Sequence, residues 1–392
     1  MKKKLLLIGI PIHNDHSRLA RSLLSLKPFE KYLKVLVVDD SGRKTKKNIK
    51  FLDEAKKILN FQLIHNNKNI GLGQSRNIMI KNCKLDFITF LDCGDTLDHS
   101  FFDFYLKQIA KNSQFDLINY RLARYFPRSE TYKGQPAFNN NNSIISEILA
   151  LRIANQATAR IYNTRFLKSN DIEFINRNIV HEDLGFVYKV FVHASKVINS
   201  PDKFSYIYFI DPGPTLARQK FSNKYLNDII IIWNDRANYL HKHKLLDTYR
   251  QCLIDGLVTF TFWKIKNFSN GGKIKKFIAY LRAYQTLKKF IFLRFGIYLS
   301  YNTLSEKAKK AIGYRNIFIL YKFKLIYRIS NKLLKKKFKY QNAKRKYLII
   351  GNGPSAKPLL QYDLDNLFYK LKKHGFKVIV INKFLRLVSD NF

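Results

Sequence analysis

The sequence predicts an α/β protein in which a mostly parallel sheet carries helices on both faces and is followed by a basic helical region. Two observations indicate this class. Through residues 1–120, short apolar runs alternate with amphipathic segments, which is typical of βαβ units whose parallel sheet is covered on both sides. From residue 216 to 346, the chain becomes helical in pattern, basic and aromatic.

The alternation is regular over the first 95 residues. The predicted strands are 4–12, 34–42, 61–67 and 86–95, and the predicted helices between them are 17–26, 47–59 and 73–83. In such a sheet the carboxyl ends of the parallel strands meet at one edge, and ligands bind beyond that edge.

Three of the predicted strands carry polar clusters at their carboxyl ends. The clusters are Pro11, His13 and Asn14 for the first strand, Asp39, Asp40 and Ser41 for the second, and Asp92 and Asp95 for the fourth. A single acidic turn has an ordinary interpretation, because Asp and Gly are common turn residues. Three polar strand ends at one edge instead indicate a functional site, in which acids hold a cation that faces a phosphorylated substrate.

Residues 121–215 are less regular. Glu182 and Asp183 stand where a helix is predicted to begin, after a segment with strand or loop character. Acids in a first helical turn are favoured by the helix dipole, so this pair has a structural interpretation beside the functional one.

Composition limits the classes of protein that fit. The 392 residues suggest two domains and a fragment, and 46% hydrophobic residues are enough for a core. The 71 Lys and Arg residues against 28 Asp and Glu give a formal net charge of +43, which indicates an anionic partner: nucleic acid, a nucleotide or an acidic membrane surface. Three scattered cysteines, Cys83, Cys93 and Cys252, predict reduced thiols in a cytosolic compartment.

The amino-terminal apolar run is too short for a signal peptide and is expected to be a buried strand. The sequence has no uninterrupted apolar stretch of about 18 residues, so a transmembrane helix is not expected.

Residues 216–346 mix Lys and Arg with Phe, Tyr, Leu and Ile, which is typical of membrane-surface binding. The alternative is a helical bundle that exposes its lysines to water. Residues 347–392 return to an α/β pattern.

Five segments of residues 4–215 together resemble the inverting, nucleotide-sugar-dependent glycosyltransferases of family 2, which have the Rossmann-like GT-A fold. The segments are PIHND at 11–15, VLVVDDSG at 35–42, NNKNIGLGQSRNIMI at 66–80, FLDCGDTLD at 90–98 and HED at 181–183. Their order and spacing agree with the family. The resemblance implies transfer from a sugar on a nucleoside diphosphate, with a divalent metal, Mn²⁺ or Mg²⁺, that neutralises the leaving group.

The resemblance also implies roles for single residues. Asp95 is expected to be the direct metal ligand, and Asp92 to orient the ion or contact the ribose. Gly94 stands where the family motif has a further acid, and Asp211 where a histidine often completes the metal site. Asp183 corresponds to the catalytic base that takes the proton of the acceptor hydroxyl, and Glu182 would orient it.

The remaining implied roles concern the donor. Asp40 would bind the uracil ring with Asp39 close by, and the loop that begins at Pro11 and includes His13 and Asn14 would frame the base. Arg76 would contact the diphosphate, where a guanidinium suits bidentate phosphate binding, and Asn77 would hold the start of its helix.

The tail, with IIGNGPSAK at 349–357, resembles the start of the bacterial family 42 sialyltransferases. Gly351, Asn352, Gly353 and Ser355 would lie at the nucleotide of that family. About 46 residues are too few for the whole domain, so no sialyltransferase activity is expected. The resemblance suggests a setting in the assembly of a bacterial surface glycan such as lipooligosaccharide or capsule.

The sequence therefore predicts three parts: a glycosyltransferase domain at 1–215, a basic helical region at 216–346 and an incomplete fragment at 347–392. The predicted enzyme moves a hexose or N-acetylhexosamine from a UDP-sugar to a surface glycan or lipid-linked glycan, on the cytoplasmic face of the inner membrane. The alternative is a non-catalytic basic protein that binds membrane or nucleic acid, without sequence-specific recognition of nucleic acid. The oligomeric state is left open.

Overall fold

The computed structural model describes residues 6–111, 114–126, 131–134, 144–153, 155–210, 220–269, 273–312, 346–350 and 376–380. The chain divides into two compact units, Met1–Ile317 and Phe318–Phe392, and each is described by itself.

The first four strands of the first unit form the predicted parallel sheet. They are β1 (Leu6–Ile12), β2 (Leu33–Asp39), β3 (Gln62–His65) and β4 (Phe87–Phe90), paired in parallel in the order β3-β2-β1-β4. β1 is buried along its whole length because both neighbours and both faces cover it.

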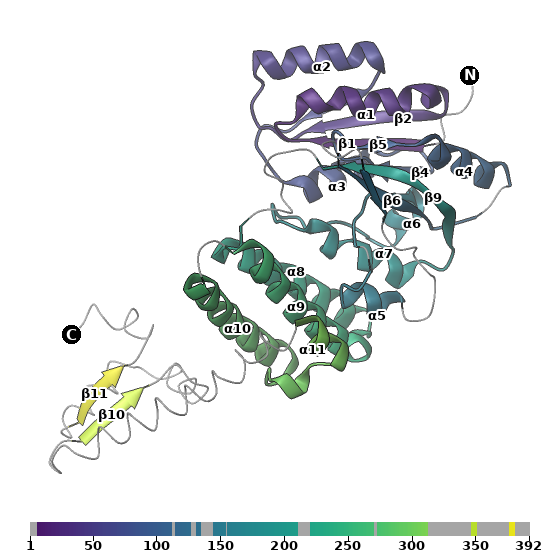
Figure 1. Cartoon of the computed structure of the whole chain (residues 1–392). Helices are drawn as coiled ribbons and strands as arrows, with labels where there is room; N and C mark the ends of the chain where they lie inside the picture. Colours follow the sequence, from purple (N-terminus) through teal and green to yellow (C-terminus); the bar gives the residue numbers. More distant parts are fainter. Residues whose placement is uncertain are drawn as a thin grey trace. The chain divides into compact units, whose positions relative to one another are not determined.

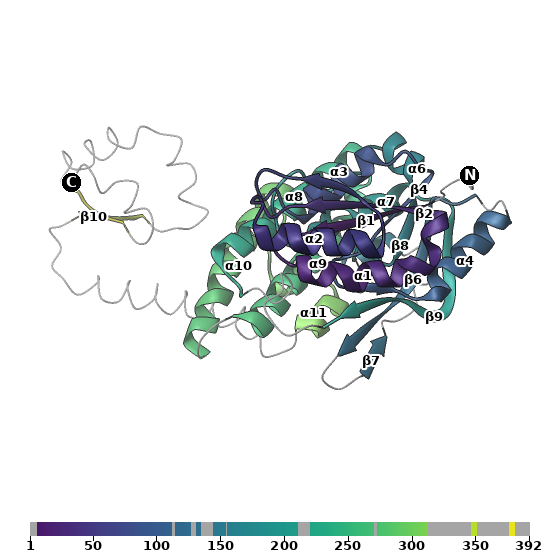
Figure 2. The same cartoon turned by 90° about the horizontal axis from the view of Figure 1, so that it is seen from above.

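Helices cover both faces of this parallel part, as predicted. α1 (Leu19–Leu26) and α2 (Lys46–Ile58) lie side by side on one face, and α3 (Leu72–Asn82) lies on the other (Figures 1 and 2). α3 packs tightly, since a Cβ atom on Gly9 of β1 would lie 2.6 Å from the sulfur of Met79. The carboxyl ends of β1, β2 and β4 therefore share one open edge.

The rest of the sheet is mixed. β8 (Arg160–Asn163) pairs antiparallel with β4, β6 (Leu117–Phe126) antiparallel with β8, and β9 (Val197–Phe209) parallel with β6. The short β5 (Thr96–Leu97) and β7 (Thr131–Gly134) pair antiparallel with β9 and β6. Because β9 is long, it brings residues near 206 back to the segment that follows β4.

Shorter helices fill the connections of this second half. They are α4 (His99–Ala110), α5 (Ile144–Leu149), α6 (Thr164–Ser169), the 3-10 turn η3 (Glu182–Gly185) and α7 (Val187–His193). The acidic pair Glu182–Asp183 thus opens a 3-10 turn that leads directly into α7.

The helical region consists of α8 (Asn223–Lys242), α9 (Leu246–Phe268), α10 (Lys273–Phe295) and α11 (Glu306–Ile312). Trp233 of α8 is fully buried, and its indole N–H donates to the Leu253 carbonyl of α9 at 2.8 Å. α9 also approaches α5 so closely that a Cβ atom on Gly256 would meet the carbonyl oxygen of Leu149. α8 and α9 are therefore packed into the same compact unit as the sheet.

In the second unit, β10 (Lys346–Ile350) and β11 (Phe376–Val380) form a parallel pair. Residues 313–345 and the segment from Gly351 to Ser355 lie outside the described residues. Among the helices that the structure describes, none is long and apolar enough to cross a membrane.

Candidate active site

Asp40, at the end of β2, is buried and shapes the loop that leads into α3. Its carboxylate accepts hydrogen bonds from Asn66 Nδ2 at 2.8 Å, from Ile70 N at 2.9 Å and from Gly71 N at 2.8 Å. Gly71 has φ +97°, a conformation that favours glycine, so the three bonds fix a turn that other residues would strain. The predicted contact of Asp40 with uracil stays a prediction.

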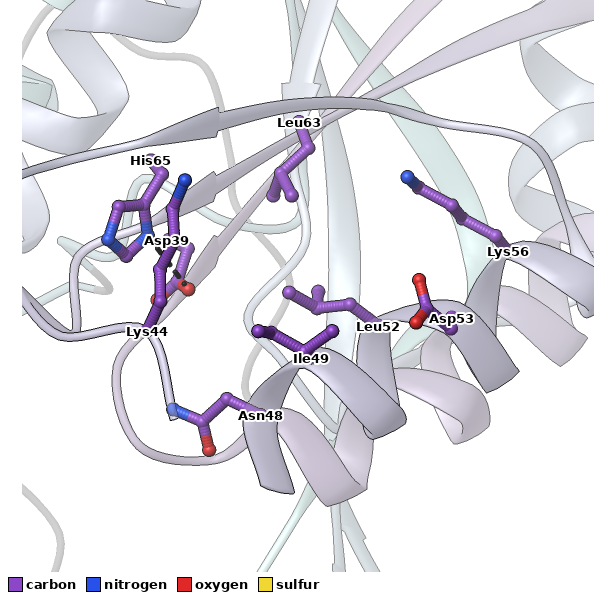
Figure 3. A pocket seen from close by; sticks show the side chains of 9 residues that line it. All are labelled: Asp39, Lys44, Asn48, Ile49, Leu52, Asp53, Lys56, Leu63 and His65. Atoms are coloured by element: carbon purple, nitrogen blue, oxygen red, sulfur yellow. Dashed lines mark hydrogen bonds and ion pairs between the residues drawn. The ribbon is translucent and has the colours of Figure 1, made fainter. Parts of the chain in front are cut away.

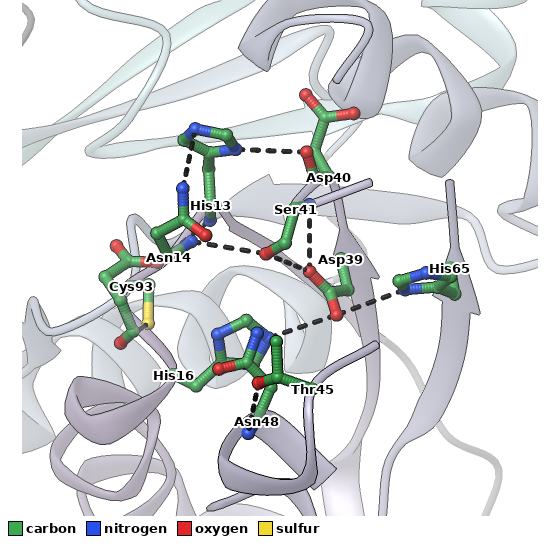
Figure 4. Close-up of polar contacts among 11 residues, drawn as sticks. His13, Asn14, His16, Asp39, Asp40, Ser41, Thr45, Asn48, His65 and Cys93 are labelled. Atoms are coloured by element: carbon green, nitrogen blue, oxygen red, sulfur yellow. Dashed lines mark hydrogen bonds and ion pairs between the residues drawn. The ribbon is translucent and has the colours of Figure 1, made fainter. Parts of the chain in front are cut away.

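Asp39 lies at the centre of a polar network beside this loop (Figure 4). Its Oδ1 accepts from Ser41 N and Oγ, at 3.0 and 2.6 Å, and its Oδ2 lies 3.0 Å from His16 Nε2 and 3.2 Å from His65 Nδ1. Burial alone would raise the pKa of Asp39, but the hydrogen bonds from His16 and Ser41 hold it well below its ordinary value. Asp39 is therefore ionised and fully bonded.

The loop after β1 lies against the same network. Pro11 is buried and pairs with Val38, whereas His13 and Asn14 are exposed. Figure 4 shows His13 Nδ1, 3.0 Å from the Asp40 carbonyl, and Asn14, whose backbone N–H donates to Ser41 Oγ at 3.2 Å. The two exposed side chains stand where the resemblance expects the donor base.

A pocket lies between α2 and β3, next to Asp39 (Figure 3). Asp39 and His65 form one wall, and the opposite wall comes from α2. The full lining is Asp39, Lys44, Asn48, Ile49, Leu52, Asp53, Lys56, Leu63 and His65. None of these residues belongs to the acidic cluster described next.

Arg76 of α3 is the centre of that acidic cluster, which we call the Arg76 cluster. It consists of Arg76, Asp92, Glu182 and Asp183. Arg76 is buried, its Nη2 donates to Asp92 Oδ1 at 2.7 Å, and its Nη1 donates to Glu182 Oε1 at 2.9 Å and to Asp183 Oδ1 at 2.7 Å. The guanidinium therefore joins the acid after β4 to the acidic pair of η3, and its predicted contact with a diphosphate stays a prediction.

The Arg76 cluster holds three carboxylates and one guanidinium, and burial disfavours the ionised form of the carboxylates that Arg76 does not neutralise. Burial and the charge of Asp183 raise the pKa of Glu182 to about 8. Burial also raises the pKa of Asp183, although Arg76 acts in the opposite direction. Glu182 is buried, whereas the side chains of Asp92 and Asp183 are 37% and 24% exposed, so these two carboxylates can meet a ligand.

Asp95 is buried beside the Arg76 cluster. Its Oδ2 accepts from the hydroxyl of Tyr206 at 2.7 Å and its Oδ1 from Phe209 N at 3.0 Å, both on β9. Burial and the nearby charge of Asp92 raise the pKa of Asp95 well above its ordinary value. Its role as the direct metal ligand stays a prediction, because both oxygens already accept a bond.

Gly94 has a structural reason to be glycine. Its φ is +94°, and a Cβ atom there would lie 2.9 Å from Nη2 of Arg21 and 3.0 Å from Cβ of Arg18. The Gly94 carbonyl also accepts from Arg21 Nε at 2.5 Å. A side chain at this position would strain the backbone and would need Arg18 and Arg21 to shift, so glycine suits the local structure.

A divalent cation fits the charge of this site. Among the described residues, no group of three or more His, Cys, Asp and Glu is arranged to hold a metal ion, and Asp211 lies outside them. Mg²⁺ usually takes one or two carboxylates together with substrate phosphates, so a complete protein cage is not required. Asp92 fits best, since its carboxylate is partly exposed and belongs to a cluster with excess negative charge.

α8 holds the turn that carries the acidic pair. The Tyr225 hydroxyl hydrogen-bonds to His181 Nε2, Asp228 Oδ2 accepts from Val180 N at 3.4 Å, and Arg236 Nε donates to the Leu184 carbonyl at 2.8 Å. His181 has φ +59°, which is uncommon for a residue with a side chain. These contacts from α8 keep the strained turn in place.

Asn77 ties α3 to the segment before this turn. Its Nδ2 donates to the Phe174 carbonyl at 2.9 Å, and its Oδ1 accepts from Phe174 N at 2.8 Å. Sequence reasoning missed the residues of α8 and β9 that support the site, such as Tyr206, Tyr225 and Arg236. No local motif marks them, because they act on partners more than 40 residues away.

Residues 7–169 match the family model described as glycosyl transferase family 2. Two curated relatives, from Staphylococcus aureus strains Mu50 and MW2, are each named poly(ribitol-phosphate) beta-N-acetylglucosaminyltransferase TarS. Each is 26% identical over 208 residues, which cover 50% of this chain and 34% of the relative. The chain spans about a third of the length of these relatives.

Two solved structures share the fold. The crystal structure of S. aureus TarS 1–349 in complex with UDP-GlcNAc superposes with a TM-score of 0.53 at 19% identity, covering 74% of this chain and 83% of that one. The crystal structure of S. aureus TarS gives a TM-score of 0.52 at 19% identity, covering 79% and 50%. Residues 7–169 thus resemble glycosyltransferases of family 2, and the chain has a GT-A-like α/β fold followed by helices, as the sequence predicts.

Proposed function

We propose that this protein is an inverting glycosyltransferase that moves an N-acetylhexosamine or hexose from a UDP-sugar to an acceptor hydroxyl. The observation that carries the proposal is the Arg76 cluster. In it, one buried guanidinium joins Asp92, at the predicted donor edge, to Asp183, at the predicted acceptor side.

Asp183 would act as the general base. It is the partly exposed acid of the η3 pair, and a raised pKa makes its carboxylate a better proton acceptor. As the acceptor oxygen attacks the anomeric carbon, its proton passes to Asp183 and the bond to the diphosphate breaks on the opposite face. The product then has the inverted configuration.

Arg76 would keep Asp183 aimed at the acceptor, and Glu182 would share the guanidinium as its buried neighbour. Asp92, with Asp95 and Asp211 as further candidates, would hold a divalent cation, which would compensate the charge of the leaving diphosphate. His13, Asn14 and the bonded pair Asp39–Asp40 would form the surroundings of the nucleotide.

The identities of the substrates follow from similarity. A relative of this fold is described in complex with UDP-GlcNAc, which supports the same class of donor here. For the acceptor we propose a bacterial surface glycan, such as lipooligosaccharide or capsule, or its lipid-linked precursor. The net charge of +43 supports a peripheral site on the anionic cytoplasmic leaflet, where each basic residue contributes about 1 kcal/mol.

The test compares Asp183→Asn with wild-type protein, measuring UDP release from UDP-GlcNAc with Mn²⁺ present. We expect a loss of about 100-fold or more in kcat, since general bases contribute about 100- to 10,000-fold, while UDP binding by calorimetry stays unchanged. Asp247→Asn, at an exposed acid of α9, is the matched control and keeps full activity. Retention of more than about a tenth of the wild-type rate would refute the role of Asp183.

The charge also favours a second candidate, a basic protein that binds nucleic acid. Binding caused by the net charge alone would be independent of sequence and would fall steeply with salt as counterions are released. A sequence-specific complex that survives physiological salt would favour this candidate over the enzyme.

A further inference from the structure

A row of aromatic rings leads from the turn with the acidic pair to the surface of α9. We call the rings of His181, Phe260 and Trp263 the aromatic row. His181 immediately precedes Glu182, and its ring meets that of Phe260 edge to face, with centroids 5.1 Å apart. Phe260 in turn stacks on Trp263 with centroids 6.1 Å apart and an angle of 20° between the planes. Two ring contacts therefore separate Trp263 from the segment that carries the candidate base.

The outer end of the row is exposed but rigidly supported. The Trp263 side chain lies near the carboxyl end of α9 and is 48% exposed. Phe260, behind it, also stacks on the buried Trp233 of α8, with centroids 6.0 Å apart and an angle of 25°. Asn267 Nδ2 caps the Trp263 carbonyl at 2.8 Å. The indole is thus supported by the ring of Phe260 while about half of the Trp263 side chain stays exposed.

A single exposed apolar residue is ordinary on a protein surface and needs no function. Trp263 differs from Leu24 and Leu293, which are also exposed, because it continues a contact path to the turn of Glu182 and Asp183. The second substrate of a transferase must reach Asp183 with a hydroxyl group. The two ring contacts place the exposed indole of Trp263 near that turn, where it could hold another part of the same substrate.

We propose that Trp263, supported by Phe260, is an acceptor subsite on which a sugar ring of the acceptor stacks. The C–H face of a pyranose is apolar and slightly positive, and it complements the negative face of an indole. The neighbouring side chains of Lys266 and Asn267 are exposed and supply donors for sugar hydroxyls. This subsite rests on the proposed glycosyltransferase function and adds to it the position of the acceptor.

The alternative occupant is a lipid surface, because tryptophan beside lysine also occurs at membrane interfaces. The position of the aromatic row favours the sugar, since it starts at the turn that carries the candidate base. The matched control is Tyr298, a second aromatic residue of the helical region, which is 55% exposed and contacts Phe292 with centroids 4.5 Å apart. Within the described part of the chain, the ring of Tyr298 makes no contact with the aromatic row.

The experiment uses tryptophan emission of the full chain, which has only Trp233 and Trp263. Chitotriose and maltotriose serve as neutral saccharide probes, and UDP release from UDP-GlcNAc in water serves as a reaction that needs no acceptor. We expect both saccharides to shift the emission of wild-type protein and of Tyr298→Ala, with no shift in Trp263→Ala. Transfer to chitotriose should show an acceptor KM raised about three- to tenfold in Trp263→Ala, with the KM for UDP-GlcNAc unchanged. Trp263→Phe should recover most of the loss.

Three results would overturn the subsite. The first is an emission shift that persists in Trp263→Ala, and the second is an equal acceptor KM in both proteins. The third is a shift caused by phosphatidylglycerol vesicles but by neither saccharide, which would assign Trp263 to a membrane. UDP release in water does not depend on this subsite. If wild-type protein releases no UDP, the result counts against the proposed function. If wild-type protein releases UDP but one of the three results above is found, only the subsite is refuted.

Discussion

Two groups of carboxylates lie along the same edge of the sheet, and the protein neutralises them in different ways. At the end of β2, Asp39 and Asp40 receive their hydrogen bonds from backbone N–H groups, an amide, a hydroxyl and two imidazoles. In the Arg76 cluster, three carboxylates share a single guanidinium. The first group is bonded to neutral and weakly basic partners, whereas the second keeps an excess of negative charge.

The difference separates carboxylates that hold the backbone in place from carboxylates that are available for a reaction. A buried carboxylate that is fully bonded fixes the backbone around it and has no capacity left for a reaction. In the Arg76 cluster, burial raises the pKa of Glu182 and of Asp183, so these two carboxylates take up a proton more readily. The same residue type therefore fixes the loop before α3 in one group and serves the proposed reaction in the other.

The largest effect on stability and activity is expected from a substitution at Arg76. Arg76→Met removes the cation of the cluster and leaves three carboxylates without it, so we expect destabilisation by about 3–5 kcal/mol and loss of transfer. Arg76→Lys keeps the charge but cannot bridge the three acids, so it should recover stability in part and activity poorly. Urea unfolding and UDP release measure both effects. Equal activity in Arg76→Met and wild-type protein would show that the cluster is not the site.

A second test addresses the bonded group. Asp40→Asn keeps the shape of the side chain but replaces an acceptor of three bonds by an amide, so at least one N–H loses its partner. We expect about 1–3 kcal/mol of destabilisation and a higher KM for UDP-GlcNAc, with kcat little changed. If kcat falls and KM does not, Asp40 takes part in the reaction and the division between the two groups is wrong.

The pH dependence of stability sharpens the comparison further. Glu182 has a pKa of about 8 in the folded protein against an ordinary value of 4.5, so its contribution to stability is full below about pH 4.5 and is lost as the pH rises through 8. Glu182→Gln removes this dependence, and we expect it to be more stable than wild-type protein at pH 8.5 by an amount on the order of 1 kcal/mol. Melting temperatures at pH 5.5, 7 and 8.5 measure the effect. Parallel curves for the two proteins would contradict the raised pKa.

The smallest effect is expected from the hydrogen bonds of α8, which carries two tyrosines that each bond to a histidine. Tyr225 bonds to His181 at the turn with the acidic pair, and Tyr239 bonds to His193 Nε2 at 2.8 Å, at the end of α7. Each Tyr→Phe change removes one hydroxyl and should cost about 0.5–1.5 kcal/mol. We expect Tyr225→Phe alone to lower kcat, by about two- to fivefold, with the KM for UDP-GlcNAc unchanged. Equal kcat values for the two variants would show that the Tyr225 hydrogen bond supports the fold but not the reaction.

The parallel half of the fold could be predicted from the sequence because its signals are local. Apolar runs of strand length, amphipathic segments and polar strand ends each lie within a few residues, and the rule that parallel strands share one edge places them together. His13, Asp40 and Asp92 were predicted at that edge and the structure places them there. The mixed half was not predicted in detail, since the pairing of β6 with β9 and β8 depends on contacts between distant segments.

The sequence by itself determined the strands, the edge and the acids that meet there. Only the tertiary structure decided which acids stay partly exposed, because Arg76 reaches Glu182 and Asp183 more than 100 residues away and no local pattern encodes that distance. It also explained why residue 94 is a glycine, since a Cβ atom there would meet Arg18 and Arg21. Local propensity and periodicity act over one or two turns, whereas charge sharing and close packing depend on which distant segments the folded chain brings together.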